Sequence, residues 1–162
     1  MIVKIILPIL MLVLCVYAQV GSTDTQPAVL ASPKHQVIPQ QCFGCICEAA
    51  SHCDLKSGCH GDVCGPFSIT WGYWSDGGKP TLNNEKPDVP SAYANCVNDV
   101  GCAAKTVQGY IDRYAQDCNG DGVINCDDYV RIHRLGGYGC NGPIDSKYME
   151  SYQSCIKYVN NI

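Results

Sequence analysis

The segment 117–128, DCNGDGVINCDD, carries oxygen-bearing side chains at a spacing typical of calcium loops. Calcium binds carboxylate, amide and backbone carbonyl oxygens, and its loops place a glycine at the sharp turn between the ligands. Gly122 occupies that turn position, and Ile124 is apolar as expected. The predicted ligands are Asp117, Asn119, Asp121, Val123 (through its backbone carbonyl), Asn125 and Asp128. Calcium is therefore a candidate ion, and the sequence indicates no other cofactor.

The cysteines of the chain suggest disulfides or a zinc site. The chain has 13 cysteines, and removal of Cys15 with a signal peptide would leave 12, an even number. In an oxidising compartment that count predicts as many as six disulfides. Cys42, Cys45 and Cys47 are close enough to raise the question of zinc, but paired C-x-x-C knuckles with histidines at ligand spacing are absent from the sequence. Disulfides are the favoured interpretation.

The first residues predict secretion. Lys4 precedes the apolar run IILPILMLVLCVYA, and Val16 and Ala18 form a small-residue cleavage pattern, so residues 1–18 are expected to be a signal peptide. The run is too short to predict a membrane span. The formal charge of −4 argues against a nucleic-acid partner, since an acidic surface repels phosphate backbones. We expect an extracellular protein.

The remaining chain divides into an arm and one folded unit. Residues 19–41 are rich in Pro, Gln, Ser and Thr and lack cysteine, which predicts a flexible N-terminal arm. Residues 42–158 suit a single domain. Helices are expected within 42–53, 92–99 after an N-cap at Ser91, 102–116, 127–135 and 146–158, with a short hairpin or irregular strands in 64–78. The predicted fold class is α+β, mostly helical with a small β element and rich in disulfides.

Several motifs together resemble the invertebrate-type lysozymes, the group that includes the destabilases. They are CFGCICEAASHC, CGPFSIT with GYWSDGG, CVNDVGCAAKTVQGYIDRY and DDYVRIHRLGGYGC, which occur in order across 42–158. The resemblance implies a lysozyme-like fold with a cleft between a helical body and a small β element. It also implies β-1,4-linked aminosugar chains as ligands, in bacterial cell walls or chitin-like glycans.

The same resemblance places the catalytic groups. Glycoside hydrolysis needs two carboxyl groups, one as acid and one as nucleophile or base. The family's acid falls on Ala50, and a methyl group gives no proton. Glu48 lies two residues earlier, about 200° round a helix, and is expected on the opposite face. Asp62 matches the second carboxylate, although Cys64 follows almost at once and shortens the hairpin that would aim it.

Cysteine positions also compare with the family pattern. Relatives carry a cysteine-bounded loop at 117–128, which implies a Cys118–Cys126 disulfide. Two further cysteines of many relatives are replaced here by Gly77 and Thr106. Because both are lost together, we expect these two positions to be partners in the relatives that keep them.

A cleft without its acid can still bind a glycan. Tyr73 and Trp74 are candidates to pack on sugar rings, although Trp71 alternates with Tyr73 in an apparently extended segment, so one of these aromatics is expected in the core. Asp76 and His133 are candidates to hydrogen-bond sugar hydroxyl or acetamido groups.

Three functions follow from the sequence. The first is a secreted lysozyme-family protein directed at peptidoglycan in antibacterial defence or digestion, with muramidase activity weak or lost. The second is a glycan-recognition protein without turnover, and the third is a calcium-stabilised structural module. Isopeptide cleavage, reported for some family members, would need a nucleophile such as Ser51 with His133 as base, and a serine and a histidine alone do not define such a site.

Overall fold

The computed structural model describes residues 37–161 of the 162-residue chain. The predicted signal peptide and residues 19–36 of the predicted arm lie outside the described residues. The helices are α2 (Gln40–Ser51), α3 (Trp71–Asp76), α4 (Ala92–Asn98), α5 (Val100–Tyr114), α6 (Cys126–Leu135) and α7 (Ser146–Val159), and the strands are β1 (Cys59–His60), β2 (Val63–Cys64) and β3 (Ile69–Thr70). The α+β, mostly helical fold class predicted from the sequence is confirmed.

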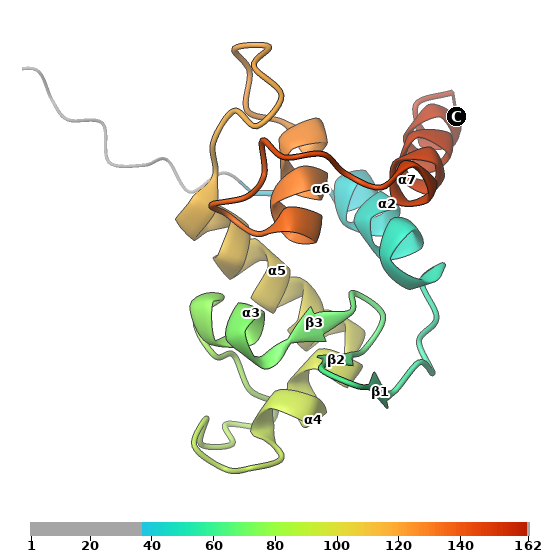
Figure 1. Ribbon diagram of the computed structural model, residues 1–162. Coiled ribbons are helices and arrows are strands. Elements are labelled where there is room, and N and C mark those ends of the chain that lie inside the picture. The colour runs from blue at the N-terminus through green and yellow to red at the C-terminus, as the bar shows by residue number, and fades with distance from the viewer. Residues whose placement is uncertain (1–36, 162) are drawn as a thin grey trace, which may run out of the picture. The chain divides into compact units, whose positions relative to one another are not determined.

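The three strands form one small antiparallel sheet in the order β1-β2-β3. Figure 1 shows this sheet with α3 and α4 beside one half of the long helix α5, whereas α6 lies beside its other half. Helices α2 and α7 pack along one another. The sheet and α3 therefore lie farther along α5 from α2, α6 and α7, which together are called the helical body.

Helix starts follow local hydrogen bonding. Helix α5 begins after Asp99, whose carboxylate accepts the backbone N–H of Cys102 at 2.8 Å. Helix α4 begins after Ser91 as predicted, but the Ser91 hydroxyl donates to Glu85 instead of capping the helix. The Ile38 side chain is 2% exposed and its N–H donates to Gln108, so the domain's packed core begins before the first cysteine of the motif.

The segment 64–78 differs from the sequence prediction. Residues from Trp71 onward are not extended, because Thr70 ends β3 and its side chain accepts the backbone N–H of Tyr73, capping α3. Trp71 and Trp74 thus lie three residues apart on one side of a helix, with ring centroids 6.4 Å apart. The predicted alternation of aromatic side chains across a strand is wrong for this reason.

Disulfides hold the elements together. All twelve cysteines of the described part pair, as Cys42–Cys126, Cys45–Cys155, Cys47–Cys53, Cys59–Cys64, Cys96–Cys102 and Cys118–Cys140. Two of these bridges tie α2 to α6 and α7. The six disulfides predicted by the cysteine count are confirmed.

The predicted Cys118–Cys126 bridge is wrong. Cys126 is the first residue of α6 and meets Cys42 of α2, with Cα atoms 5.7 Å apart. Cys118 is buried at the other end of the loop and bonds to Cys140, with Cα atoms 5.4 Å apart. The backbone N–H of Cys118 donates to the buried Asp128, which holds Cys118 against the first turn of α6. Helix packing, which a local sequence pattern does not contain, decides the pairing.

Gly77 and Thr106 lie in direct contact. A Cβ atom built on Gly77 would lie 2.5 Å from the carbonyl oxygen of Thr106 and 3.1 Å from its Cγ2 atom. This contact is what the hypothesis of a paired loss of cysteines requires. Because Gly77 has no side chain, the end of α3 can approach α5 closely.

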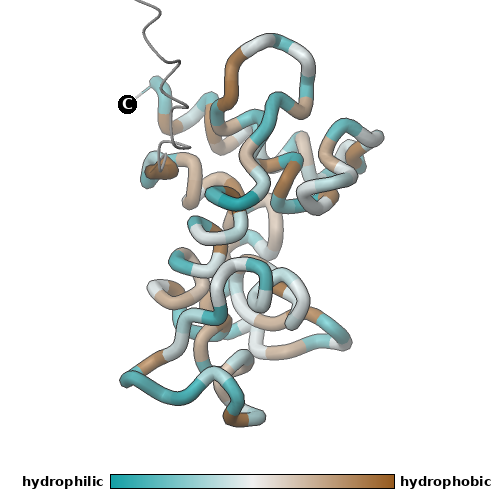
Figure 2. The backbone as a smooth tube through the Cα atoms, turned by 90° about the vertical axis from the view of Figure 1, so that its left-hand side faces the viewer, coloured by the Kyte–Doolittle hydropathy of each residue, from teal (hydrophilic) through white to brown (hydrophobic). Residues whose placement is uncertain are grey.

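Polar and apolar residues alternate along the backbone, as Figure 2 shows by colour. Such alternation is typical of helices that bury one face. The expected core residues Val107, Tyr110 and Ile111 of α5 are buried. Among the described residues, no helix is long and apolar enough to cross a membrane.

Candidate functional site

A cleft of about 460 Å³ opens where the sheet, α3 and the helical body meet. Its walls come from the end of α2, the β2–β3 hairpin, α3, α5, the end of α6 with the turn that follows, and the start of α7. The lining residues are Ala50, Val63, Phe67, Ser68, Thr70, Gly72, Tyr73, Asp76, Tyr110, His133, Arg134, Leu135, Gly136 and Tyr148. The sequence-predicted residues Tyr73, Asp76 and His133 are brought together here.

Tyr73 and His133 form the centre of one wall. The Tyr73 ring stacks on Tyr110 with centroids 3.7 Å apart and an interplanar angle of 14°. One nitrogen of His133, Nε2, lies 2.9 Å from the carbonyl oxygen of Phe67 and must donate to it. The other, Nδ1, then accepts the Tyr73 hydroxyl at 3.0 Å. The geometry fixes a neutral imidazole and its tautomer.

Electrostatics agree with a neutral histidine. Desolvation by the surrounding protein is the main reason that the pKa of His133 is lowered from 6.5 to about 4; the hydrogen bond to Phe67 opposes this effect, and the charge of Arg134 adds a smaller lowering. Desolvation also raises the pKa of the Tyr73 phenol well above its usual value. Neither group is charged near neutral pH, so this part of the wall presents uncharged polar and aromatic groups.

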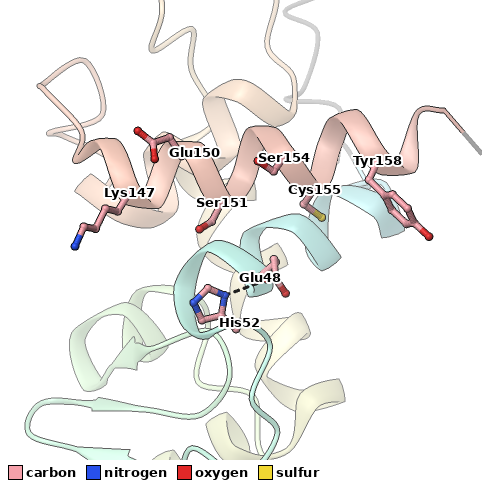
Figure 3. Close-up of a pocket in the computed structure, with 8 residues that line it drawn as sticks. All are labelled: Glu48, His52, Lys147, Glu150, Ser151, Ser154, Cys155 and Tyr158. Carbon is pink, nitrogen blue, oxygen red and sulfur yellow. Dashed lines mark hydrogen bonds and ion pairs between the residues drawn. The ribbon is translucent and has the colours of Figure 1, made fainter.

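Ala50 lies in the cleft wall. Its side chain is half-buried, and its carbonyl oxygen accepts the hydroxyl of Ser68 at 3.3 Å. Glu48 instead lines a separate groove between α2 and α7, where its carboxylate lies 3.1 Å from the Nδ1 atom of His52 (Figure 3). The helix turn therefore separates Glu48 from the cleft, as the spacing of two residues indicates.

Asp62 lies outside the cleft lining. Strands β1 and β2 pair Cys59 with Cys64 and His60 with Val63, so Gly61 and Asp62 form the two-residue turn between them. The Asp62 side chain is exposed on this turn, and Val63 lines the cleft in its vicinity. The short hairpin, closed by the Cys59–Cys64 disulfide, does not bring the predicted carboxylate among the lining residues.

Asp76 is the one carboxylate among the described lining residues. Its Oδ1 atom accepts Arg113 at 3.2 Å, and its Oδ2 atom accepts the Tyr114 hydroxyl at 3.1 Å. The ion pair is half-exposed, so its energetic contribution is small, but it orients the carboxylate at the edge of the cleft.

Trp74 does not reach the cleft. Its side chain is 1% exposed, its indole N–H donates to the Pro80 carbonyl at 2.9 Å, and its ring packs near Tyr93. The prediction that Trp74 contacts sugar is therefore corrected: the ring belongs to the core. Trp71, in contrast, is 57% exposed with the Lys79 amine 5.4 Å from its ring.

Ser51 and His133 are not paired with one another in the described structure. Ser51 donates its hydroxyl to the Pro66 carbonyl at 2.6 Å, and both ring nitrogens of His133 already have partners. Within the described structure these two residues therefore do not form the relay that acyl transfer requires.

Sequence reasoning missed two lining residues of chemical interest. Arg134 carries its charge to the cleft edge and pairs with Asp145 at 2.8 Å. Tyr148 is 5% exposed, and its hydroxyl has no hydrogen-bond partner among the described residues. Tyr148 follows helical spacing in α7 and resembles an ordinary core residue in sequence, so no local signal marks it.

The loop 117–128 lies between α5 and α6. Its carboxylates accept backbone N–H groups: Asp117 from Gly120 and Gly122, and Asp121 from Val123. The hydrogen bonds from Gly122 and Gly120 lower the pKa of Asp117. In the part of the chain that the structure describes, no group of three or more His, Cys, Asp or Glu side chains is arranged to hold a metal ion. Calcium binding by the six predicted ligands stays a prediction.

Comparisons with known proteins agree with this geometry. The model of the destabilase family matches residues 39–155. A lysozyme of Magallana gigas is 37% identical over 119 residues, which cover 70% of this chain and 77% of that protein. Invertebrate-type lysozyme 3 of Caenorhabditis elegans is 34% identical over 118 residues, covering 70% and 84%.

Solved structures match as well. The Meretrix lusoria lysozyme in complex with PliI from Aeromonas hydrophila is 30% identical with a TM-score of 0.58, covering 72% of this chain and 89% of that one. The Tapes japonica lysozyme is 32% identical with a TM-score of 0.53, covering 73% and 88%.

Proposed function

Because the chain belongs to the destabilase family of invertebrate-type lysozymes, we propose that it binds β-1,4-linked aminosugar glycans outside the cell, with muramidase activity weak or lost. The glycans are those of bacterial cell walls or chitin-like chains, met in antibacterial defence or digestion. The observation that carries the proposal is the methyl group of Ala50, which lines the cleft where the family resemblance puts the catalytic acid.

Hydrolysis needs a proton donor and a second carboxylate on opposite sides of the scissile bond. Among the described lining residues the carboxylate is that of Asp76, which already accepts hydrogen bonds from Arg113 and Tyr114. Asp62 is exposed on the β1–β2 turn. His133 does not replace the acid, because its lowered pKa of about 4 leaves it without a second proton near neutral pH. We therefore expect the cleft to lack a group that protonates the leaving oxygen, which is the first step of cleavage.

The cleft retains groups that suit glycan binding. Small-ligand sites combine apolar and aromatic walls with a few oriented polar groups. The cleft presents the stacked Tyr73 and Tyr110 rings together with the hydroxyls of Ser68 and Thr70 and the guanidinium of Arg134. These groups match the mixed C–H and hydroxyl surface of a pyranose.

Net charge favours recognition over killing. The formal charge is −4, and an acidic protein is repelled by anionic bacterial envelopes. A lysozyme that kills by hydrolysis gains from a basic surface, whereas a recognition protein that binds a neutral glycan does not need one.

A steric block of the cleft tests the proposal. Gly72 lines the cleft within α3, and a Cβ atom there would meet nothing closer than 3.9 Å, so Gly72→Phe should fold and fill the cleft. Gly44 lies exposed on α2 with nothing within 4 Å of an added Cβ, which makes Gly44→Phe the matched control. Binding to bacterial cell walls and to a chito-oligosaccharide is measured separately from the release of fragments from each of them.

We expect the wild-type protein and Gly44→Phe to bind glycan with little release, and Gly72→Phe to lose binding. Rapid release of fragments by the wild-type protein would contradict the loss of turnover. If neither glycan binds to the wild-type protein, glycan recognition is wrong altogether.

A further inference from the structure

A row of four tyrosine rings leads away from the cleft. Tyr73 stacks on Tyr110 at 3.7 Å, Tyr110 contacts Tyr114 at 4.6 Å, and Tyr114 meets Tyr138 edge-on at 5.4 Å. The first two rings line the cleft. The Tyr114 hydroxyl donates to Asp76, also a lining residue, so the outer rings begin at the cleft edge.

Tyr138 ends the row and is 95% exposed. A large aromatic side chain left in water gains no burial, so packing does not explain this residue. Scattered exposed apolar residues are common, and exposure by itself indicates nothing. The position of Tyr138 at the end of a row that starts inside the cleft distinguishes it.

The turn that carries Tyr138 is fixed in place. The Gly137 N–H donates to the Tyr110 hydroxyl at 3.2 Å, and the Gly137 carbonyl accepts the side-chain amide of Gln116. A Cβ atom on Gly137 would lie 2.3 Å from the Tyr114 ring, so only glycine allows this approach. The exposed ring is thus presented by an ordered backbone, which reduces the entropy lost on binding.

The surroundings of the ring suit a sugar. Arg113 and Asp76 form a half-exposed ion pair beside Tyr114, and the Arg113 guanidinium lies 5.4 Å from the Tyr114 ring. These charges can donate to and accept from hydroxyl groups, while an aromatic face packs on pyranose C–H groups. A single ring flanked by charges offers too little apolar area for a stable protein interface.

We propose that Tyr138, with Tyr114 and the Asp76–Arg113 pair beside it, forms an outer subsite for one further pyranose of a glycan chain that extends from the cleft. This subsite rests on the proposed glycan binding. Its consequence is a dependence on chain length: a long oligosaccharide reaches Tyr138, whereas a short one ends inside the cleft.

Calorimetric titration with chitotriose and chitohexaose tests the subsite. Tyr138→Ala should weaken chitohexaose binding roughly three- to tenfold, the scale of one aromatic contact, and leave chitotriose binding unchanged. Tyr138→Phe keeps the ring and should retain wild-type affinity. Tyr158→Ala is the matched control, because Tyr158 is also exposed, at 70%, but lies in the α2–α7 groove (Figure 3).

Each outcome decides the question. Unchanged chitohexaose affinity in Tyr138→Ala, while the wild-type protein binds both sugars, would overturn the subsite and leave glycan binding intact. Equal weakening for both sugars, or for Tyr158→Ala as well, would also overturn it, because the effect would not depend on reaching the outer ring. Absence of binding by the wild-type protein would remove the proposed function and the subsite together.

Discussion

The Tyr73 hydroxyl donates to the Nδ1 atom of His133 at 3.0 Å, because the other ring nitrogen of His133 is committed to the Phe67 carbonyl. This relationship links α3, α6 and the β2–β3 hairpin across the cleft wall. It holds only while the imidazole is neutral, since a protonated Nδ1 would present a second donor to the tyrosine and the phenol would have to rotate its hydrogen away.

Stability should therefore fall in mild acid. The pKa of His133 is lowered from 6.5 to about 4, so between these values the unfolded chain binds a proton that the folded chain does not. The contribution of His133 to the free energy of unfolding is then most favourable above pH 6.5 and decreases as the pH falls toward 4. Below pH 4 this contribution changes no further, and the total decrease is at most about 3 kcal/mol. Urea unfolding at a series of pH values measures it.

His133→Gln supplies the control for that measurement. Glutamine keeps a donor and an acceptor but does not titrate, so the difference in pH dependence between wild type and variant isolates His133 from the carboxylates that titrate in acid. Identical pH profiles for the two proteins would contradict a lowered histidine pKa.

Restoring the acid should restore chemistry if the rest of the machinery is present. Ala50→Glu puts a carboxyl group into the cleft wall near Phe67 and His133. General acid catalysis typically contributes roughly a hundredfold or more, so release of reducing ends from cell walls should rise clearly above that of the wild-type protein. Reducing-end assays over several pH values would show it.

The control for this gain is Ala50→Gln, which has nearly the same shape and no acidic proton. A second comparison adds Asp62→Asn to Ala50→Glu, which should abolish the gain if Asp62 supplies the second carboxylate. Equal, negligible release by the Glu and Gln variants would mean that the shortened hairpin leaves no second carboxylate in reach.

The connectivity of Cys118 and Cys140 can be read directly from the protein. Proteolysis without reduction should give a peptide pair joined by these two cysteines, and another joined by Cys42 and Cys126. Replacing Cys118 and Cys140 together by serine should lower the free energy of unfolding by about 3 kcal/mol, as expected for opening a loop of this size. A Cys118–Cys126 peptide would contradict the pairing.

Asp128 should matter more for stability than its exposed neighbours. Its side chain is fully buried, and its two oxygens accept the backbone N–H groups of Cys118 and Asn125, each at 2.8 Å. Asp128→Asn places an amide against one of these donors and should cost about 2–3 kcal/mol in chemical unfolding. Asp121→Asn, on the exposed loop, is the control and should change the stability little. A similar loss in both variants would refute the special position of Asp128.

Calcium provides the last prediction. If the six predicted ligands hold calcium, the melting temperature should be higher in millimolar calcium than in EGTA, and Asp117→Asn should remove the difference, because Asp117 is the first of these ligands. The same melting temperature in calcium and in EGTA would contradict the ion site and would indicate a loop closed by its own hydrogen bonds.

The sequence by itself determined the fold class, the six disulfides as a number and the family, because these depend on residue identity, order and spacing along the chain. It also gives an alanine at position 50, where the resemblance implies the acid. The position of Glu48 away from the cleft also follows from helix geometry alone, and the structure agrees with it.

Only the tertiary structure decided which residues meet. Cys118 pairs with Cys140 because α6 turns Cys126 toward α2. Trp74 enters the core because Thr70 starts a helix where the aromatic pattern predicted an extended segment. The Tyr138 ring meets Tyr114, which packs on the cleft-lining Tyr110 of the same helix α5. The cysteine pairing and the neighbours of Tyr138 depend on how helices pack across long sequence separations, which no local pattern of residues encodes. The start of α3 depends on a local cap, the Thr70 side chain, which the aromatic pattern did not indicate.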